Sequence, residues 1–252
     1  MHVAQAPLPG LLERVLQTCR ADKPLEQEAM SWICHDPKLS SHVLRAVNST
    51  ANGFPRQLTS VQQSLRLLNP QIAQRIVTEA MQVPTEADLQ RVSQAWRVSL
   101  KTAIYAEYLA IALQLPSEEE AFSAGMLHNI GDYVRAGYFS AEMQEIHDIQ
   151  TSSCPVMQGV KLAQQWRFSE SLQAVIRYHE QNQFIDEPED LVMLVAIAQR
   201  LMADKNLSPA MFAWFASRIE MSEADFYTWR ERFVASADDF YERRMRWIHN
   251  AA

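Results

Sequence analysis

Glycine is scarce in this chain, with 6 residues in 252, while apolar side chains recur at helical spacing along almost the whole length. Sheets and barrels need many tight turns built on glycine, so the scarcity favours helices joined by short loops that contain Pro, Ser and Asn. The spacing is clearest at Leu89, Val92, Trp96, Leu100 and Ala103, which lie three or four residues apart. The sequence therefore predicts an all-α fold.

Capping residues and prolines set the expected helix limits. Ser60 and Gln63 form a capping box, a pattern that satisfies free amides at the start of a helix. We expect Asn69-Pro70 to end this helix, because Asn tolerates a left-handed backbone and Pro cannot continue a helix. The other expected helices cover approximately 8–16, 25–34, 39–47, 87–113, 118–138, 155–166, 169–180, 191–205, 208–218 and 222–249.

These helices divide the chain into three predicted parts. Residues 1–84 form an N-terminal helical bundle, residues 85–205 a second helical subdomain, and residues 206–252 a C-terminal helical extension. The apolar positions of the last helix, which include Phe226 and Trp247, are compatible either with packing on the same chain or with dimerisation.

The charge balance argues against a nucleic-acid partner. The formal net charge is −7, whereas proteins that bind nucleic acids usually carry a stripe of Lys and Arg that neutralises phosphates. The only basic cluster, Arg243-Arg244-Met245-Arg246, follows Asp238-Asp239, so we interpret it as a charged helix face. No nucleic acid is expected as a partner.

Nothing in the sequence indicates a membrane. The longest apolar run, 191–198, is far shorter than a membrane span, and the first residues lack the basic and apolar stretches of a signal peptide. The three cysteines form no Cys-x-x-Cys pair and are odd in number, which suits a reducing compartment. We expect a cytoplasmic protein without a membrane partner.

Several short motifs follow one another in a specific order. They are Leu8-Pro9, Asp36-Pro37-Lys38-Leu39, Val47-Asn48-Ser49, Leu58-Thr59-Ser60-Val61, Trp96-Arg97-Val98-Ser99, the segment 121–131 with Leu127-His128-Asn129-Ile130-Gly131, and then Gly159, Trp166 and His179. From Leu8 to about Lys205 the chain resembles the HDOD family, a bacterial signalling relative of the HD phosphohydrolases. The resemblance implies an N-terminal helical bundle packed on a degenerate HD-like helical domain with C-terminal helices.

The resemblance also indicates where the metal ligands of an HD phosphohydrolase would fall. The first His would fall on Val98, the His-Asp pair on His128-Asn129 and the distal Asp on Gln199. The two further His would fall on Pro155 and on Tyr178, which is followed by His179. Val98 and Pro155 offer no donor atom for a metal. Asn129 and Gln199 are amides and lack the negative charge of a carboxylate. Because a hydrolytic site needs several convergent ligands to lower the pKa of a bound water, we expect no metal, no cofactor and no catalytic residue.

The remaining polar residues could still bind a ligand. His128, Asn129, Tyr178 and His179 are candidates for lining the remnant cleft around a small anionic or nucleotide ligand, and Asn48 and Ser49 are further candidates. Each also has a structural interpretation: buried histidines bond to neighbouring backbone or amide groups, and short polar side chains satisfy helix ends or the following loop. Both interpretations remain open.

The function that the resemblance implies is a non-catalytic regulatory or scaffold module in bacterial signal transduction. It would act through contacts with signalling proteins in trans, since we recognise no receiver or cyclic-dinucleotide domain in the sequence. Two alternatives remain. An HD-type metal-dependent phosphohydrolase with an altered ligand set predicts bound metal and phosphodiester turnover, and a nucleotide-binding sensor predicts stabilisation by a cyclic dinucleotide.

Overall fold

The structure is a computed structural model that describes residues 27–49, 56–80, 87–115, 118–143, 154–181 and 189–251. The regular elements in these ranges are all helices, which confirms the predicted all-α fold. They are α2 (Gln27–Cys34), α3 (Pro37–Val47), α4 (Val61–Leu67), α5 (Pro70–Ala80), α6 (Leu89–Ala112), α7 (Glu118–Leu127), α8 (Ile130–Arg135), α9 (Ser140–Met143), α10 (Pro155–Gln165), α11 (Glu170–Tyr178), α12 (Asp190–Met202), α13 (Pro209–Ala216) and α14 (Glu223–Ala251). The helix expected at 8–16 lies outside the described residues.

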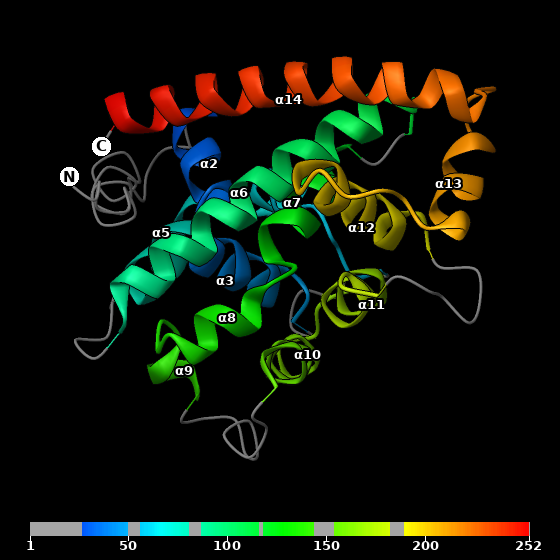
Figure 1. The fold of residues 1–252 in the computed structure, drawn as a ribbon. Helices are drawn as coiled ribbons and strands as arrows, with labels where there is room; N and C mark the ends of the chain where they lie inside the picture. Colours follow the sequence, from blue (N-terminus) through cyan, green and yellow to red (C-terminus); the bar gives the residue numbers. More distant parts are fainter. Residues whose placement is uncertain are drawn as a thin grey trace.

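The long helix α6 runs through the middle of the molecule (Figure 1). Helix α7 packs along α6, and α12 lies against both of them. Helices α8, α10 and α11 form one group of neighbours, while α3 and α4 contact α7 from the N-terminal part of the chain. The predicted architecture, N-terminal helices packed on an HD-like domain with C-terminal helices, is confirmed. The domain boundaries near residues 84 and 205 stay a prediction.

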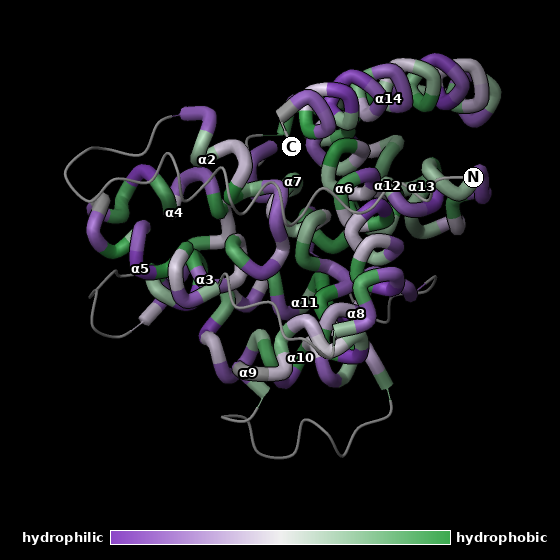
Figure 2. The backbone as a smooth tube through the Cα atoms, turned by 90° about the vertical axis from the view of Figure 1, so that its left-hand side faces the viewer, coloured by the Kyte–Doolittle hydropathy of each residue, from purple (hydrophilic) through white to green (hydrophobic). Residues whose placement is uncertain are grey.

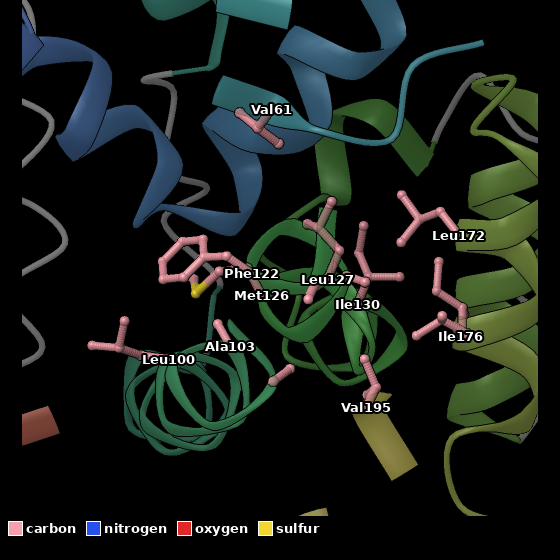
Figure 3. Packing of buried hydrophobic residues seen from close by; sticks show 14 of the residues in the cluster. Val61, Leu100, Ala103, Phe122, Met126, Leu127, Ile130, Leu172, Ile176 and Val195 are labelled. Carbon is pink, nitrogen blue, oxygen red and sulfur yellow. The ribbon is translucent and has the colours of Figure 1, made fainter. Parts of the chain in front are cut away.

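The core is centred on α7, which lies between α6, α11 and α12 (Figure 3). In this core α7 packs closely on α6 at Gly125, where a Cβ atom would come 2.4 Å from the Cα atom of Ala103. The two helices can therefore approach closely only because position 125 has no side chain. The buried apolar residues around it include Leu100, Phe122, Met126, Leu127, Ile130, Leu172, Ile176 and Val195.

The capping prediction at Ser60 is confirmed, and the helix ends at Leu67, just before Asn69-Pro70 as predicted, but the capping role predicted for Asn69 is wrong. Ser60 Oγ accepts a hydrogen bond from the Gln63 amide at 3.0 Å. Asn69 does not close the same helix in a left-handed conformation; its Oδ1 accepts from the Ile72 amide at 2.8 Å and caps the next helix, α5. The physical reason is that Asn is among the best N-cap residues and Pro70 is suited to the first helical position, where no amide donor is needed.

The prediction of one continuous helix over 118–138 is also wrong. Helix α7 ends at Leu127 and α8 begins at Ile130, so that His128 and Asn129 form the turn between them. His128 Nδ1 lies 2.7 Å from the carbonyl oxygen of Gly125, the acceptor that the next helical amide would have used. The Asn129 side chain is bonded to α6, which fixes the turn.

The C-terminal helix α14 folds back on α6 and α12, which is one of the two arrangements left open by its sequence. Apolar and polar residues alternate along it (Figure 2), and Phe226, Phe233, Ala237 and Ile248 are buried. Asp238 strengthens the packing, because its Oδ1 accepts from the Tyr105 hydroxyl at 2.7 Å and lies 2.8 Å from the Lys101 ammonium. Within the described residues, no helix has the length and apolar content that a membrane span requires.

Candidate functional site

Asn129, where the family resemblance predicts the acidic ligand of an HD phosphohydrolase, is held by a chain of hydrogen bonds. Ser99 Oγ donates to Asn129 Oδ1 at 2.6 Å, and Asn129 Nδ2 donates to the Ala95 carbonyl at 3.3 Å. The Tyr133 hydroxyl lies 2.8 Å from Ser99 Oγ, and it must be the donor because Ser99 has already given its single proton to Asn129. The amide therefore ties the α7–α8 turn to α6, and both of its polar atoms have partners.

His128 and His179 lie edge to face, with ring centroids 4.9 Å apart and an interplanar angle of 80°. His179 Nδ1 lies 3.2 Å from the Val175 carbonyl and 3.1 Å from the Ile176 carbonyl, and His128 Nδ1 is bonded to Gly125. Since a carbonyl only accepts, each Nδ1 carries the proton and each Nε2 carries a lone pair. Burial, reinforced by the repulsion that a protonated His179 would exert, lowers the pKa of His128 to about 3, and burial lowers the pKa of His179 as well, so the pair is neutral at pH 7.

Of the six candidate residues, the structure brings the rings of His128 and His179 together, whereas the side chain of Asn129 bonds to α6. Tyr178 is 37% exposed, with the Arg177 guanidinium 5.9 Å from its ring centre. Asn48 Nδ2 donates to the Leu58 carbonyl at 2.9 Å, and Asn48 Oδ1 accepts from the Leu58 backbone amide at 2.7 Å.

Asn48 thus fastens the loop that follows α3, in agreement with its structural interpretation. Ser49 stands beside it, and its backbone amide donates to the Ala46 carbonyl at 3.4 Å. None of the described hydrogen bonds or ring contacts joins Asn48 to the histidine pair.

A cavity of about 410 Å³ opens beside Asn129, between α6 and α8; we call it the α6–α8 cleft. Its charged residues were not predicted, because they come from two helices that are distant in sequence. The only local signal was the spacing of Arg91, Gln94 and Val98 along one face of α6. The cleft is lined by Arg91, Gln94, Ala95, Val98, Asn129, Asp132 and Arg135.

The charges of the α6–α8 cleft nearly balance. Arg91 Nε lies 3.1 Å from Asp88 Oδ2, and both side chains are largely exposed. Burial raises the pKa of Asp132, although the charge of Arg135 opposes the shift. Two guanidinium groups at the mouth of a cavity of this size can bind a small anion, because guanidinium recognises carboxylate and phosphate through paired hydrogen bonds.

The residues of the cleft do not fit a hydrolytic metal. Val98 contributes an apolar side chain, and the Asn129 amide is engaged with α6. In the part of the chain that the structure describes, no three His, Cys, Asp or Glu side chains are grouped so that they could hold a metal ion. Gln199, the expected position of the distal ligand, is an uncharged amide on α12.

Comparison with known proteins identifies the family. The HDOD domain family matches residues 6–182, so the chain belongs to the HDOD family and the predicted resemblance is confirmed. The crystal structure of the MmoQ response regulator from Methylococcus capsulatus str. Bath is similar, with a TM-score of 0.63 and 18% identity over 90% of this chain and 96% of that chain.

A second structure of that regulator, covering its fragment 20–298, has a TM-score of 0.61 and 18% identity over 84% of this chain and 90% of that chain. A putative phosphohydrolase from Shewanella amazonensis SB2B has a TM-score of 0.46 and 19% identity over 100% of this chain and 99% of that chain. At such identities the likeness of the regulator shows the shared fold alone. No curated protein sequence matches the chain.

Three buried histidines should make the protein sensitive to mild acid. Burial lowers the folded-state pKa of His35 and of His128 to about 3, and it lowers that of His179 as well. At pH values between this folded-state pKa and the ordinary histidine pKa near 6.5, the unfolded chain binds more protons than the folded protein. The free energy of unfolding therefore falls as the pH is lowered. His35 and His128 should each contribute about 1.4 kcal/mol per pH unit, and His179 should add to the slope in the same direction. Urea unfolding at pH 7, 6 and 5 measures the slope, and His128→Gln should make it shallower; an unchanged slope would contradict the neutral pair.

The substitution Asn129→Asp should destabilise the protein by about 1–3 kcal/mol at neutral pH. A carboxylate keeps the bond from Ser99 but faces the Ala95 carbonyl with no proton to donate, so two acceptors oppose each other. The cost should shrink in acid, where the carboxyl group is protonated and can donate. Urea unfolding at two pH values checks this, with Asp132→Asn at the exposed neighbouring position as the control. If the Asn129→Asp protein were as stable as the parent protein at pH 7, the bond from the Asn129 amide to the Ala95 carbonyl would not contribute to stability.

Proposed function

We propose that this protein is a non-catalytic regulatory module of bacterial signal transduction that works through contacts with signalling proteins in the cytoplasm. The observation that carries the proposal is the bonding of Asn129, whose amide fastens α6 to the α7–α8 turn where an HD phosphohydrolase has a metal-binding carboxylate. A residue committed to holding two helices together is a structural part of the fold. Its chemistry suits a rigid scaffold better than a metal centre.

The chemistry of the neighbouring positions supports the same proposal. Metal-dependent hydrolysis needs a cation that lowers the pKa of a bound water, and such a cation is held by several nitrogen or oxygen donors. His128 and His179 supply two neutral imidazoles, while Val98 supplies none and Asn129 and Gln199 supply amides. Glu180 Oε1 lies 3.9 Å from His179 Nε2, but no three His, Cys, Asp or Glu side chains of the described residues are grouped so that they could hold a metal ion.

The α6–α8 cleft gives the module a place for a regulatory ligand. Arg91 and Arg135 stand on different helices, so a small anion bound by both would connect α6 with α8. A ligand that binds only the folded state stabilises it, and one that bridges two helices also favours their relative position. We therefore include a small phosphate- or carboxylate-bearing ligand in the proposal as the input that adjusts the surface offered to partners.

The proposal predicts no turnover of phosphodiesters. Purified protein incubated with Mn²⁺, Fe²⁺ or Zn²⁺ should hydrolyse neither an activated aryl phosphodiester nor a cyclic dinucleotide above the rate of the His128→Gln/His179→Gln variant. Metal-dependent turnover that both histidine changes abolish would favour the alternative, a phosphohydrolase with an altered ligand set. The double variant is the matched control, because it removes the paired imidazoles and leaves the residues that line the α6–α8 cleft unchanged.

Ligand binding in the α6–α8 cleft has a separate test. Pyrophosphate and cyclic dinucleotides should raise the melting temperature in a saturable way, and Arg135→Gln should remove the shift. Arg75→Gln is a suitable control, since Arg75 is an exposed residue of α5 that pairs with Glu79 of the same helix. A shift that survives Arg135→Gln and Arg91→Gln would exclude this cleft as the binding site.

A further inference from the structure

A second cavity lies between α2 and the C-terminal end of α14, and it shares no residue with the α6–α8 cleft. Its volume is about 300 Å³, and it is lined by Ser31, Phe240, Arg243, Arg244 and Trp247. Figure 1 shows α2 beneath the end of α14. The two arginines belong to the basic cluster of the sequence, which the proposed function leaves without a role.

Arg244 is held in position by a neutral histidine. His35 is 1% exposed, and its Nδ1 donates to the Ser31 carbonyl at 2.5 Å, so its Nε2 carries the lone pair that accepts from Arg244 Nη1 at 3.2 Å. Burial, together with the charge of Arg244, lowers the pKa of His35 to about 3. Because the imidazole is uncharged, it orients the guanidinium without neutralising it.

Carboxylates near these arginines compete only weakly for Arg244. Within the described residues Arg244 forms no ion pair, whereas Arg243 Nη2 lies 2.9 Å from Asp239 Oδ2 on the exposed side of α14. Glu107 of α6 feels the charge of Arg244: burial raises the pKa of its carboxyl group, and Arg244 opposes that shift. The positive charge of Arg244 is therefore available to a ligand.

Aromatic rings form the walls of the cavity. The guanidinium carbons of Arg243 and Arg244 lie 5.8 Å and 5.2 Å from the ring centre of Phe240. The ring of Trp247 packs against Trp32 at 6.4 Å and against His35 at 5.7 Å, so its position is fixed from behind. Flat rings next to two guanidinium groups provide a stacking surface and paired hydrogen-bond donors in one place.

We propose that this cavity binds a nucleoside monophosphate. The phosphate would accept hydrogen bonds from Arg243 and Arg244, and the base would stack on Trp247 or Phe240, as bases commonly do on aromatic side chains. The volume is at the lower end of the range for small-ligand sites, about 300–1,000 Å³, which suits a single nucleotide. Such a ligand would join α2 to α14 and stabilise the docked position of the C-terminal helix.

Calorimetric titration of the full chain with AMP, GMP, CMP and UMP, and with inorganic phosphate for comparison, tests the proposal. At least one nucleotide should bind saturably and at least about tenfold more tightly than phosphate, a difference of about 1.4 kcal/mol. Arg244→Gln should weaken this binding at least about tenfold, and Glu107→Gln, which removes the opposing charge, should strengthen it. Arg232→Gln on the exposed part of α14 should change nothing.

Two controls keep this test separate from the α6–α8 cleft and from misfolding. Arg91→Gln should leave the nucleotide affinity unchanged, because Arg91 lines the other cavity. Circular dichroism and melting temperature show whether Arg244→Gln remains folded, and Phe240→Leu tests the stacking wall independently. The proposal is overturned if no nucleotide binds at millimolar concentration, if phosphate binds as tightly as the nucleotides, or if folded Arg244→Gln binds normally.

Discussion

The variant Gly131→Ala should be less stable than the parent protein by about 3 kcal/mol or more. A Cβ atom at this position would come 1.8 Å from the carbonyl oxygen of Pro155 and 2.5 Å from its carbonyl carbon. Both are backbone atoms and cannot rotate away, so α8 and α10 would have to separate. Urea unfolding monitored by circular dichroism measures the loss.

Gly137→Ala is the matched control for Gly131→Ala. Gly137 has a φ of 75°, so alanine there should cost about 1 kcal/mol through backbone strain. Because α8 carries Asp132 and Arg135 of the α6–α8 cleft, Gly131→Ala should also weaken ligand binding there, whereas the control should weaken it less. Equal stability of the two alanine variants would contradict the close approach of α8 and α10.

The variant Lys38→Met should lose about 3–5 kcal/mol, because it leaves a buried carboxylate without its cation. The Lys38 ammonium, 1% exposed, lies 3.0 Å from Glu142 Oε1, which is also 3.0 Å from His42 Nε2. Burial alone would raise the pKa of Glu142, but the bond from His42 and the charge of Lys38 hold it below its usual range. Methionine keeps the length and apolar character of the lysine stem, so the loss reports the charge. Urea unfolding at pH 7 measures it.

A double-mutant cycle separates this ion pair from simple packing. Glu142→Gln removes the carboxylate charge, so Lys38→Met in the Glu142→Gln background should cost less than Lys38→Met alone. The difference is the coupling between α3 and α9, two helices that are far apart in the sequence. Strictly additive losses would show that the pair contributes nothing to holding the N-terminal helices on the HD-like domain.

The fold was predictable because its helix limits depend on local signals. The hydroxyl of Ser60 and the spacing along α6 act within a few residues, and both predictions agree with the structure. The error at Asn69 is local, because Asn69 caps the next helix through the Ile72 amide, whereas the error over 118–138 has a long-range cause. Asn129 and His128 interrupt the helix predicted over 118–138 because they bond to Ser99, Ala95 and Gly125, and the first two of these partners lie on another helix. No local pattern predicts such a partner.

The candidate site was predictable only in part for the same reason. Family resemblance pointed to His128 and His179, and the structure places their rings in contact. Arg91 and Arg135 went unnoticed, because an exposed arginine on a helix carries no signal until a second helix places another arginine beside the same cavity. His35 was missed because its role depends on Arg244, more than two hundred residues further along the chain.

The central claim is that this HDOD protein binds partners and ligands without a catalytic metal. Elemental mass spectrometry of protein purified without chelator or metal-affinity tag tests it most directly. The account predicts less than about a tenth of an equivalent of iron, manganese or zinc, because two imidazoles and an engaged amide hold such ions weakly. Close to one equivalent of metal in the parent protein, lost in the His128→Gln/His179→Gln variant, would contradict the account and favour a hydrolase.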